Sequence, residues 1–240
     1  MTAEEYYQQH ALTQAPVELS ARHDFRRLST RPSEAEYALH WLAREAKPGA
    51  LLDVGCGPLT LLTNARGLFS RREGVDIARC PSWDLHPGIS TQLCDLDQGP
   101  LPFTVETFDA VTCLMVIEHV FDPFHAVGEL RRVCKADGRV VIGVPNLAGP
   151  KRRLELLRGK LPVTSTPTSF NDGSWDGYHL HNFTRASLGW LLQKEGLEPV
   201  SWAAQGRLPW LKQRWPSILG NDLIVMARIV EPQPNLTFPH

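Results

Sequence analysis

The strongest constraint on this fold is a short apolar run that ends in a pair of glycines. Leu51–Val54 leads directly into Gly55–Pro58, and apolar residues at helical spacing follow from Leu59 to Ala65. A buried strand, a glycine turn and a helix in that order are typical of an α/β sheet. Glycine lets the backbone approach a ligand closely, and a helix N-terminus offers oriented N–H groups to it. Alone, the pattern is equally consistent with a tight structural turn.

Further strands and helices alternate along the chain. Helices are expected from about residue 3, after Thr30–Pro32 up to Pro48, from Asp122 to near Asp137–Gly138, and after Thr184 up to Gly196. Six more strands are expected at Gly74–Ile77, Ser90–Cys94, Phe108–Leu114, Arg139–Val144, Val200–Ala203 and Asp222–Val230. This alternation predicts a doubly wound, seven-stranded, mostly parallel sheet with helices on both faces. The last two strands, which have no helix between them, predict an antiparallel pair at one edge.

Composition narrows the class of protein. The 240 residues carry 25 Lys and Arg against 26 Asp and Glu, and 42% of them are hydrophobic. A net charge of −1 argues against a strongly basic nucleic-acid binder, and the hydrophobic content is that of a globular domain. The five cysteines are scattered without a C-x-x-C pair, which predicts a reducing compartment and no metal site. No uncharged run reaches the roughly 18–20 residues that span a bilayer, so we expect a soluble cytoplasmic protein.

Two acids follow the predicted second and third strands. Asp76 lies 76 − 53 = 23 residues beyond Asp53, and Asp95 ends the third strand beside Leu96. A carboxylate about 20 residues beyond the first strand can accept both hydroxyl groups of a ribose. A carboxylate after the third strand can accept from an adenine amino group while a leucine packs on the ring. The spacing therefore indicates a nucleoside site.

Together these segments resemble class I S-adenosylmethionine-dependent methyltransferases, in the small-molecule branch similar to the type 11 methyltransferases. The resemblance covers residues 51–146 in the family's order. It is carried by Leu51–Gly57, Val75–Ile77, Cys94–Asp97, Leu101–Phe103, Phe108–Val111, Ile117–Val120 and Leu130–Asn146. It implies a Rossmann-like fold, S-adenosylmethionine as cofactor and S-adenosylhomocysteine as product.

The resemblance also implies which residues bind the cofactor. Gly55, Cys56 and Gly57 would hold the methionine part, supported by Asp53. The remaining implied contacts are Asp76 and Ile77 to the ribose, Asp95 and Leu96 to the adenine, and Leu114 and Met115 beside the methyl group. Thr60 replaces the third glycine of G-x-G-x-x-G, which argues against a dinucleotide-dependent dehydrogenase, because a pyrophosphate needs close helix packing there.

The later segments resemble methyltransferases associated with cell-envelope glycan or lipid biosynthesis, on Pro145–Leu147, the basic stretch 151–160 and Tyr178–Thr184. This implies methyl transfer to a small molecule or to a glycan or lipid precursor, and we expect it at oxygen. Two rivals are a non-catalytic protein that binds the cofactor as a partner or regulatory subunit, and a nucleic-acid methyltransferase. No N/D-P-P-Y/F motif follows the fourth strand, so DNA is not expected as a substrate.

One methyltransferase domain over 1–240 is expected. Its parts are an N-terminal helical lid (1–48), a cofactor-binding core (50–145), a substrate-side insertion (146–183), and a C-terminal helix with edge strands (184–230). The sequence does not determine the oligomeric state.

Three histidines are candidates for the base that deprotonates an acceptor, because imidazole titrates near neutral pH. His119 follows the fourth strand, where it would either face the substrate or anchor the next helix. His179 and His181 lie two residues apart, so in an extended segment only one reaches the pocket. His181 is taken as catalytic with His119, although it would also suit a cap for the helix after Thr184. Tyr7, Tyr178 and His179 are taken as acceptor contacts, and the alternative for Tyr7 is packing on the sheet edge.

Residues 151–160 carry five positive charges and one negative, a net +4 in a chain of net −1. Their leucines recur at helical spacing, which predicts an amphipathic basic helix. Two interpretations stay open: a solvated helix face, or weak contact with an anionic membrane surface or a phosphate-bearing acceptor.

Overall fold

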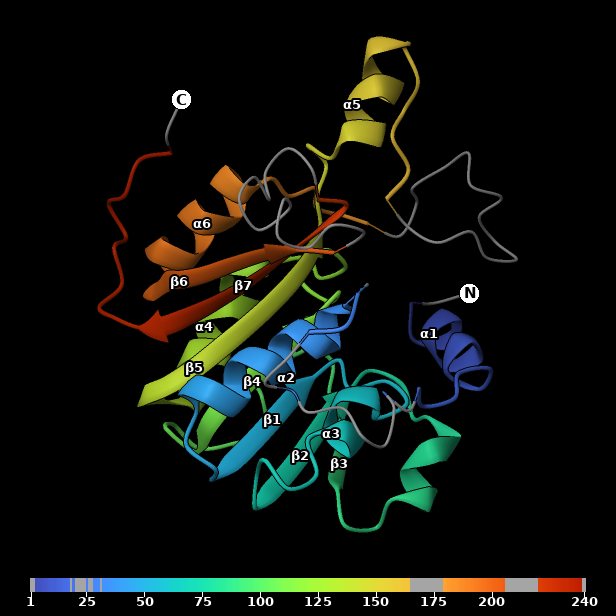
Figure 1. The fold of residues 1–240 in the computed structure, drawn as a ribbon, viewed down its shortest axis with the longest axis vertical. Coiled ribbons are helices and arrows are strands. Elements are labelled where there is room, and N and C mark those ends of the chain that lie inside the picture. Colours follow the sequence, from blue (N-terminus) through green and yellow to red (C-terminus); the bar gives the residue numbers. More distant parts are fainter. Residues whose placement is uncertain are drawn as a thin grey trace.

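One mixed sheet of seven strands, in the order β3-β2-β1-β4-β5-β7-β6, organises the protein (Figure 1). The computed structural model describes residues 3–17, 19, 25, 28–30, 32–164, 179–205 and 220–238. The strands are β1 (Ala50–Val54), β2 (Arg71–Asp76), β3 (Ser90–Leu93), β4 (Phe108–Leu114), β5 (Cys134–Pro145), β6 (Leu197–Ala204) and β7 (Asp222–Ile229). The helices are α1 (Ala3–Ala11), α2 (Glu34–Glu45), α3 (Thr60–Asn64), α4 (Pro123–Val133), α5 (Pro150–Leu157), α6 (Arg185–Lys194) and the 3₁₀ helix η1 (Pro81–Leu85).

The predicted fold class is confirmed. Strands β3, β2, β1, β4 and β5 pair in parallel, whereas β7 pairs antiparallel with both β5 and β6. The antiparallel strand therefore lies one position inside the edge of the sheet. β1 to β4 connect through crossovers, which brings their carboxyl ends to one edge of the sheet.

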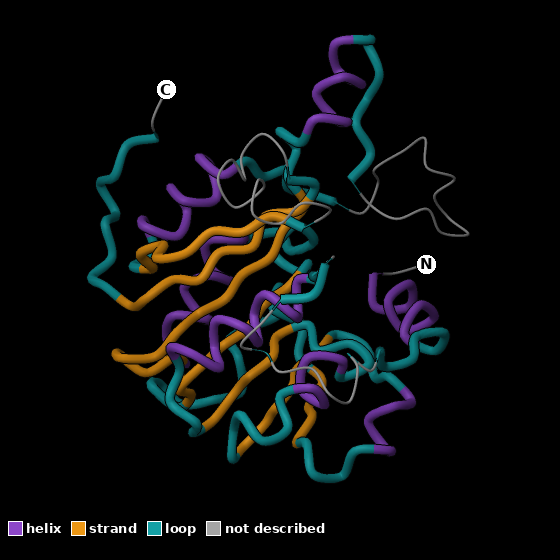
Figure 2. The backbone as a smooth tube through the Cα atoms, viewed as in Figure 1, coloured by secondary structure: helices purple, strands orange, loops and turns teal. Residues whose placement is uncertain are grey.

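Helices cover both faces of the sheet (Figure 2). On one face, α4 and α6 bury Val127, Leu130 and Leu188 against the sheet, while α2 and α3 bury Leu39 and Leu62 against the other. α1 instead lies near the carboxyl ends of the strands (Figure 1). Of the two helices within the predicted lid (1–48), α2 belongs to the layer that covers the sheet. A lid role for α1 stays a prediction.

Two hydrogen bonds from the Gln8 side chain to the Arg79 backbone hold α1 there. Gln8 donates through Nε2 to the carbonyl of Arg79 (3.0 Å) and accepts through Oε1 from the Arg79 N–H (3.2 Å). Arg79 follows β2, so this pair ties α1 to the edge of the sheet where the carboxyl ends of the parallel strands meet.

The predicted end of α4 at Asp137–Gly138 is wrong. The helix ends at Val133, and Cys134 is already extended, so β5 begins five residues before the predicted Arg139. The register between β4 and β5 shifts between Phe108 and Ala110, and the residues that looked like a helix end lie in this irregular start of the strand. The helical spacing of apolar residues in α4 ends at Val133, and it does not indicate where an irregular strand begins after it.

Asp109 fastens the start of β1 to the neighbouring strands. Its Oδ2 accepts from the Ala50 N–H at 2.8 Å, and its Oδ1 accepts from Lys135 Nζ at 2.9 Å. A Cβ at Gly49 would lie 1.9 Å from Asp109 Oδ2, so only glycine permits this approach. Burial opposes ionisation, but the Ala50 and Lys135 hydrogen bonds outweigh it and hold the pKa of Asp109 below its ordinary value.

We expect Asp109→Ala to lower the free energy of unfolding by about 1–3 kcal/mol, because a buried N–H loses its acceptor. Urea unfolding followed by circular dichroism measures the change. Asp84→Ala is the matched control, since Asp84 pairs with Arg79 on the surface and its loss should cost less than about 0.5 kcal/mol. Equal losses in the two variants would contradict the anchoring role of Asp109.

Candidate active site

The glycine turn after β1 is fixed from two sides. The N–H groups of Gly55 and Cys56 both donate to the carbonyl of Val75 in β2, at 2.8 and 3.1 Å. Gly55 has φ +76°, and a Cβ there would lie 2.1 Å from Cγ2 of Val116, which follows β4. Gly57 also has positive φ, +44°. Glycine is therefore required at Gly55 both by conformation and by the close approach of the β4 loop.

Cys56 contributes its backbone to this turn, while its side chain is buried in the core. A Cβ at Gly74 would lie 2.7 Å from Cys56 Sγ and 2.9 Å from Leu62 Cδ1, so the thiol fills the space above the glycine of β2. Burial raises the pKa of the Cys56 thiol strongly, which keeps it neutral.

Asp76 closes the turn from the end of β2. One carboxylate oxygen accepts from the Gly57 N–H (2.8 Å) and the other from the Ala78 N–H (3.1 Å). Trp83 Nε1 donates to the Gly57 carbonyl at 2.8 Å, so both the N–H and the carbonyl of Gly57 are hydrogen-bonded. Burial raises the pKa of Asp76, and the adjacent Ile77 is half-buried.

Asp53 lies in β1 beneath this turn and is 5% exposed. Its Oδ1 accepts from Thr112 Oγ1 at 2.6 Å. Burial raises the pKa of Asp53 to about 7; the Thr112 hydrogen bond opposes the shift and the charge of Asp76 adds to it. A buried acid and a half-buried acid, Asp53 and Asp76, therefore lie near each other, and the ion pairs among the described residues include neither of them.

The third implied contact region follows β3. Leu96 is 8% exposed and belongs to the core that α4 covers. Asp95 is half-buried and accepts from the Asp97 N–H at 2.9 Å through one oxygen, and Asp97 accepts from the Phe121 N–H at 2.8 Å. The β3 loop is thus joined to the loop after β4.

These residues fit S-adenosylmethionine. Its ammonium and sulfonium groups are positive, and Asp53 and Asp76 supply negative charge at the turn where the backbone is open to a ligand. Asp95 and Leu96 follow β3, the next strand outward from β2. In doubly wound sheets nucleotides bind where the strand order reverses, which in this sheet is between β1 and β4.

The loop after β4 faces the glycine turn. Leu114 ends the strand and packs on the core, and Met115 takes φ +58° while its N–H donates to the Gly143 carbonyl at 2.9 Å. The chain then turns through Glu118, whose side chain is 1% exposed. Burial raises the pKa of Glu118 to about 8, and the charge of Asp222 adds to the shift.

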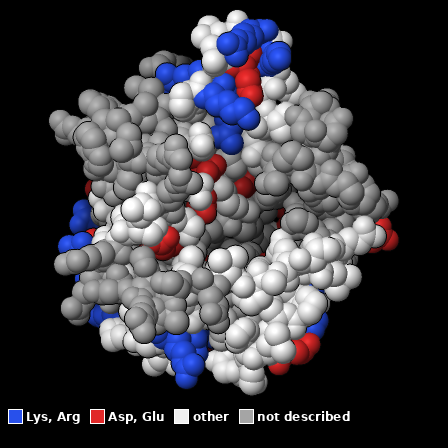
Figure 3. Space-filling view, turned by 45° about the vertical axis from the view of Figure 1, so that its right-hand side comes forward, with Lys and Arg blue, Asp and Glu red and all other residues white. Residues whose placement is uncertain are grey.

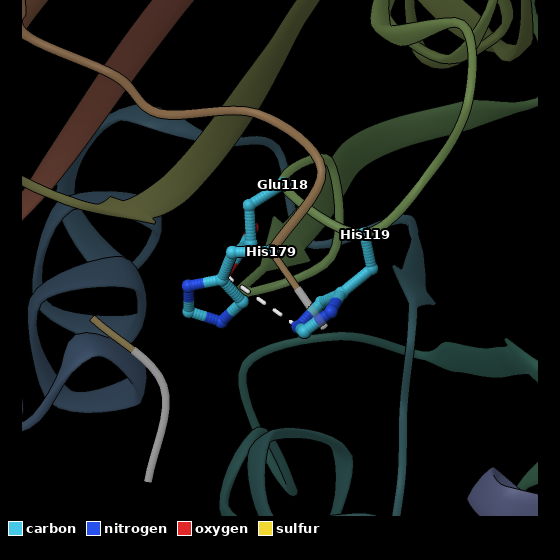
Figure 4. A group of neighbouring side chains, drawn as sticks. All are labelled: Glu118, His119 and His179. Atoms are coloured by element: carbon cyan, nitrogen blue, oxygen red, sulfur yellow. Dashed lines mark ion pairs between the residues drawn. The ribbon is translucent and has the colours of Figure 1, made fainter. Parts of the chain in front are cut away.

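Two histidines lie next to Glu118 (Figure 4). The ring centroids of His119 and His179 are 4.7 Å apart at 75°, and His119 Nε2 lies 4.0 Å from Glu118 Oε1. Tyr7 of α1 also packs edge-on against the His119 ring, with 5.8 Å between the ring centroids. The sequence predicted both histidines and Tyr7 as site residues but not Glu118. The position of Glu118 next to His119, in a loop after a strand, could have indicated it.

Backbone hydrogen bonds place His179 there. The N–H groups of Leu180 and His181 both donate to the carbonyl of Glu118, at 2.8 and 3.1 Å. His179 and His181 have different neighbours, as expected for an extended segment. The ring that packs on His119 is that of His179, whereas the sequence analysis chose His181. His181 Nε2 lies 3.2 Å from the carbonyl of Phe121. Tyr178 lies outside the described residues.

The basic helix stands away from the body of the protein. α5 has no buried residue, and Leu157 is 84% exposed. In the space-filling view the basic side chains of α5 lie above a hollow whose wall carries acidic groups (Figure 3). Of the three basic residues in α5, Arg152 has a structural contact, because its Nη1 donates to the carbonyls of Asn146, at 2.9 Å, and Asn221. Contact with an anionic surface stays a prediction. No helix among the described residues is long and apolar enough to cross a membrane.

Comparison with known proteins identifies the class. The family described as a methyltransferase domain matches residues 21–201. The chain belongs to this family and is a class I S-adenosylmethionine-dependent methyltransferase, as the motifs predicted.

Curated relatives match over part of their length. A ubiquinone biosynthesis O-methyltransferase from Pseudomonas syringae pv. tomato is 30% identical over 130 residues, which cover 50% of this chain and 55% of that protein. An uncharacterized 37.1 kDa protein in a Streptomyces fradiae transposon is 36% identical over 115 residues, 43% of this chain and 32% of that protein. The chain therefore spans about a third to a half of these relatives.

Solved structures share the fold. Geranyl diphosphate C-methyltransferase from Streptomyces coelicolor A3(2) has a TM-score of 0.60 at 17% identity, over 95% of this chain and 97% of that one. The 1,6-didemethyltoxoflavin-N1-methyltransferase from Burkholderia thailandensis, solved with S-adenosylhomocysteine, has a TM-score of 0.56 at 17% identity, over 82% and 77%.

We expect Asp95→Ala to weaken S-adenosylhomocysteine binding by about tenfold, the loss of one hydrogen bond to a charged group, without lowering stability. Asp76→Ala should weaken binding as well, but it also removes the acceptor of the Gly57 and Ala78 N–H groups and should lower the melting temperature. Calorimetry and thermal unfolding separate the two effects. Unchanged affinity in both variants would contradict the assignment.

We also expect affinity for S-adenosylmethionine to rise with pH between about 6 and 8, because a folded-state pKa near 7 leaves Asp53 about half protonated at neutral pH and a cationic ligand favours its ionised form. Binding at pH 7 should release up to roughly half a proton from this group. Calorimetry in two buffers of different ionisation enthalpy measures the release. Asp53→Asn is the control that retains the titration of the ligand itself, and the same proton release in this variant would exclude Asp53 as its source.

Proposed function

We propose that the protein transfers the methyl group of S-adenosylmethionine to a hydroxyl oxygen of a small molecule, within the class of glycan or lipid precursors. The observation that carries this proposal is the group of Glu118, His119 and His179. Glu118 and His119 belong to the loop after β4, which closely approaches Gly55 through Val116, and His179 joins them from the segment before α6. Polar groups that converge beside a methyl-donor site suit an acceptor that must be oriented and deprotonated. The relatives named ubiquinone biosynthesis O-methyltransferase support oxygen as the acceptor atom.

In this proposal the chain has three tasks. Gly55, Gly57, Asp53 and Asp76 hold the cofactor, which supplies a methyl carbon already activated by its sulfonium. His119 and His179 receive the acceptor hydroxyl and align it with that carbon, a proximity effect that can lower the barrier by several kcal/mol. His181 has no part in this step, because its ring faces the Phe121 carbonyl.

α1 has the third task, to exclude water. Tyr7 packs edge-on against His119, and Gln8 holds the helix to the loop after β2. A covered acceptor side strengthens the polar contacts within it and limits loss of the methyl group to water.

The test is turnover with S-adenosylmethionine labelled in the methyl group and a panel of phenols, catechols, sugars and their hydroxylated lipid conjugates. Mass spectrometry and NMR of the product identify the atom that carries the label, which we expect to be oxygen. His179→Ala should lower kcat/KM by about 100-fold or more, whereas the matched variant His181→Ala should lower it by less than about threefold. A label on nitrogen or carbon, or equal losses in the two variants, would contradict the proposal.

A further inference from the structure

Glu118 is an acid buried without the contacts that normally accompany burial. Its side chain is 1% exposed, and among the described residues neither carboxylate oxygen accepts a hydrogen bond from another residue. Elsewhere this chain does satisfy its buried acids: Asp109 bonds Ala50 and Lys135, and Glu129 bonds the Leu101 N–H and Arg132. A buried carboxylate without partners is costly, so its presence at a functional edge of the sheet calls for a ligand.

Two imidazole side chains lie close to Glu118. One ligand atom from each of Glu118, His119 and His179 can be chosen so that all three lie within 4.8 Å of one another. The side chains come from two separate segments, the loop after β4 and the return of the 146–183 segment, and they point toward one another in Figure 4. Convergence from two segments distinguishes this group from a chance run of polar residues.

The surroundings orient the imidazoles as a metal site requires. Thr164 Oγ1 is hydrogen-bonded to Nδ1 of His179, so in this proposal Nε2 is the nitrogen that would bind the cation. The carbonyl of Glu118 accepts hydrogen bonds from the N–H groups of Leu180 and His181. The backbone next to His179 is therefore fixed to the loop that carries Glu118 and His119. A ligating histidine typically has its second nitrogen held by such a partner, which sets the tautomer and the ring orientation.

We propose that Glu118, His119 and His179 bind a divalent transition-metal cation, with Zn²⁺ the ion that best suits the donors. Two imidazoles and one carboxylate with a remaining open position are a donor set typical of catalytic zinc, whereas Mg²⁺ prefers a shell of oxygen atoms. The proposal differs from the expectation of no metal site. That expectation came from cysteine spacing, which cannot show ligands that the fold brings together from distant segments.

The donors must approach one another when the cation binds. Bonds of about 2.0–2.1 Å in a tetrahedral site separate the ligand atoms by about 3.3 Å, less than the 4.8 Å limit of the present group. Rotation of the His119 and His179 side chains supplies this movement, since each ring is only half-buried.

The consequence for catalysis rests on the proposed function. The acceptor hydroxyl would bind at the open position of the cation, which would lower the pKa of that hydroxyl. That hydroxyl loses its proton to solvent, its oxygen forms a bond to the methyl carbon, and the carbon–sulfur bond breaks with its electron pair left on sulfur. The products are the methyl ether and neutral S-adenosylhomocysteine, so the cation is neither oxidised nor reduced.

The test uses the full-length, tag-free protein after treatment with a chelator, and it needs no acceptor. Titration with Co²⁺ followed by visible absorption, and with Zn²⁺ by calorimetry, should show one equivalent bound. Glu118→Gln and His179→Ala should each weaken binding by about tenfold or more, while a large excess of Mg²⁺ should not displace Co²⁺. His181→Ala is the matched control two residues away and should bind as the wild type does.

S-adenosylhomocysteine affinity and thermal unfolding check that each variant is folded. The proposal is overturned if the wild type binds no stoichiometric Co²⁺ or Zn²⁺, if both ligand variants bind as tightly as the wild type, or if Mg²⁺ displaces Co²⁺. Stoichiometric binding without methyl transfer to any hydroxyl would support the cation site and contradict the proposed function, so the two failures are distinguishable.

Discussion

The convergence of strand ends around β1 is the constraint on which the rest of the site depends. From β1 the chain goes to β2 and β3 on one side, and then crosses to β4 on the other, so a crevice opens at the carboxyl end of β1. Gly55 lies at this point, held by the Val75 carbonyl on one side and pressed against Val116 on the other. A single backbone position therefore couples the loop that faces the cofactor to the loop that carries Glu118 and His119.

The distribution of buried acids follows function rather than stability. Asp109, far from the crevice, is paired with Lys135 and its pKa is lowered, whereas burial raises the pKa of Asp53 and Glu118 at the crevice. Leaving carboxylates unpaired in the interior destabilises the folded chain, and such groups cluster at binding sites because a ligand supplies the missing charge. In the proposed function Asp53 serves the cofactor half of the site and Glu118 the acceptor half, so both halves would use a buried acid whose pKa is raised.

The sequence predicted most of the sheet because each strand is a short apolar run bounded by turn residues, and parallel strands are buried on both faces. It failed at the junction of α4 and β5, where helical spacing ends at Val133 and an irregular strand starts without an intervening turn. It also grouped α2 with α1. The buried face of α2 was visible in the spacing, but a periodic pattern does not say which surface of the protein that face covers.

The sequence by itself determined which residues gather in the proposed cofactor half of the site, because the glycine turn, Asp76 and Asp95 each follow a strand and the ends of parallel strands meet. The composition of the proposed acceptor half was decided by tertiary structure. His179 lies 179 − 119 = 60 residues beyond His119, and the choice between His179 and His181 depends on how Leu180 and His181 bond the Glu118 carbonyl. Alternation along an extended segment shows that the two rings diverge, but only the packing of that segment on the β4 loop determines which one meets Glu118.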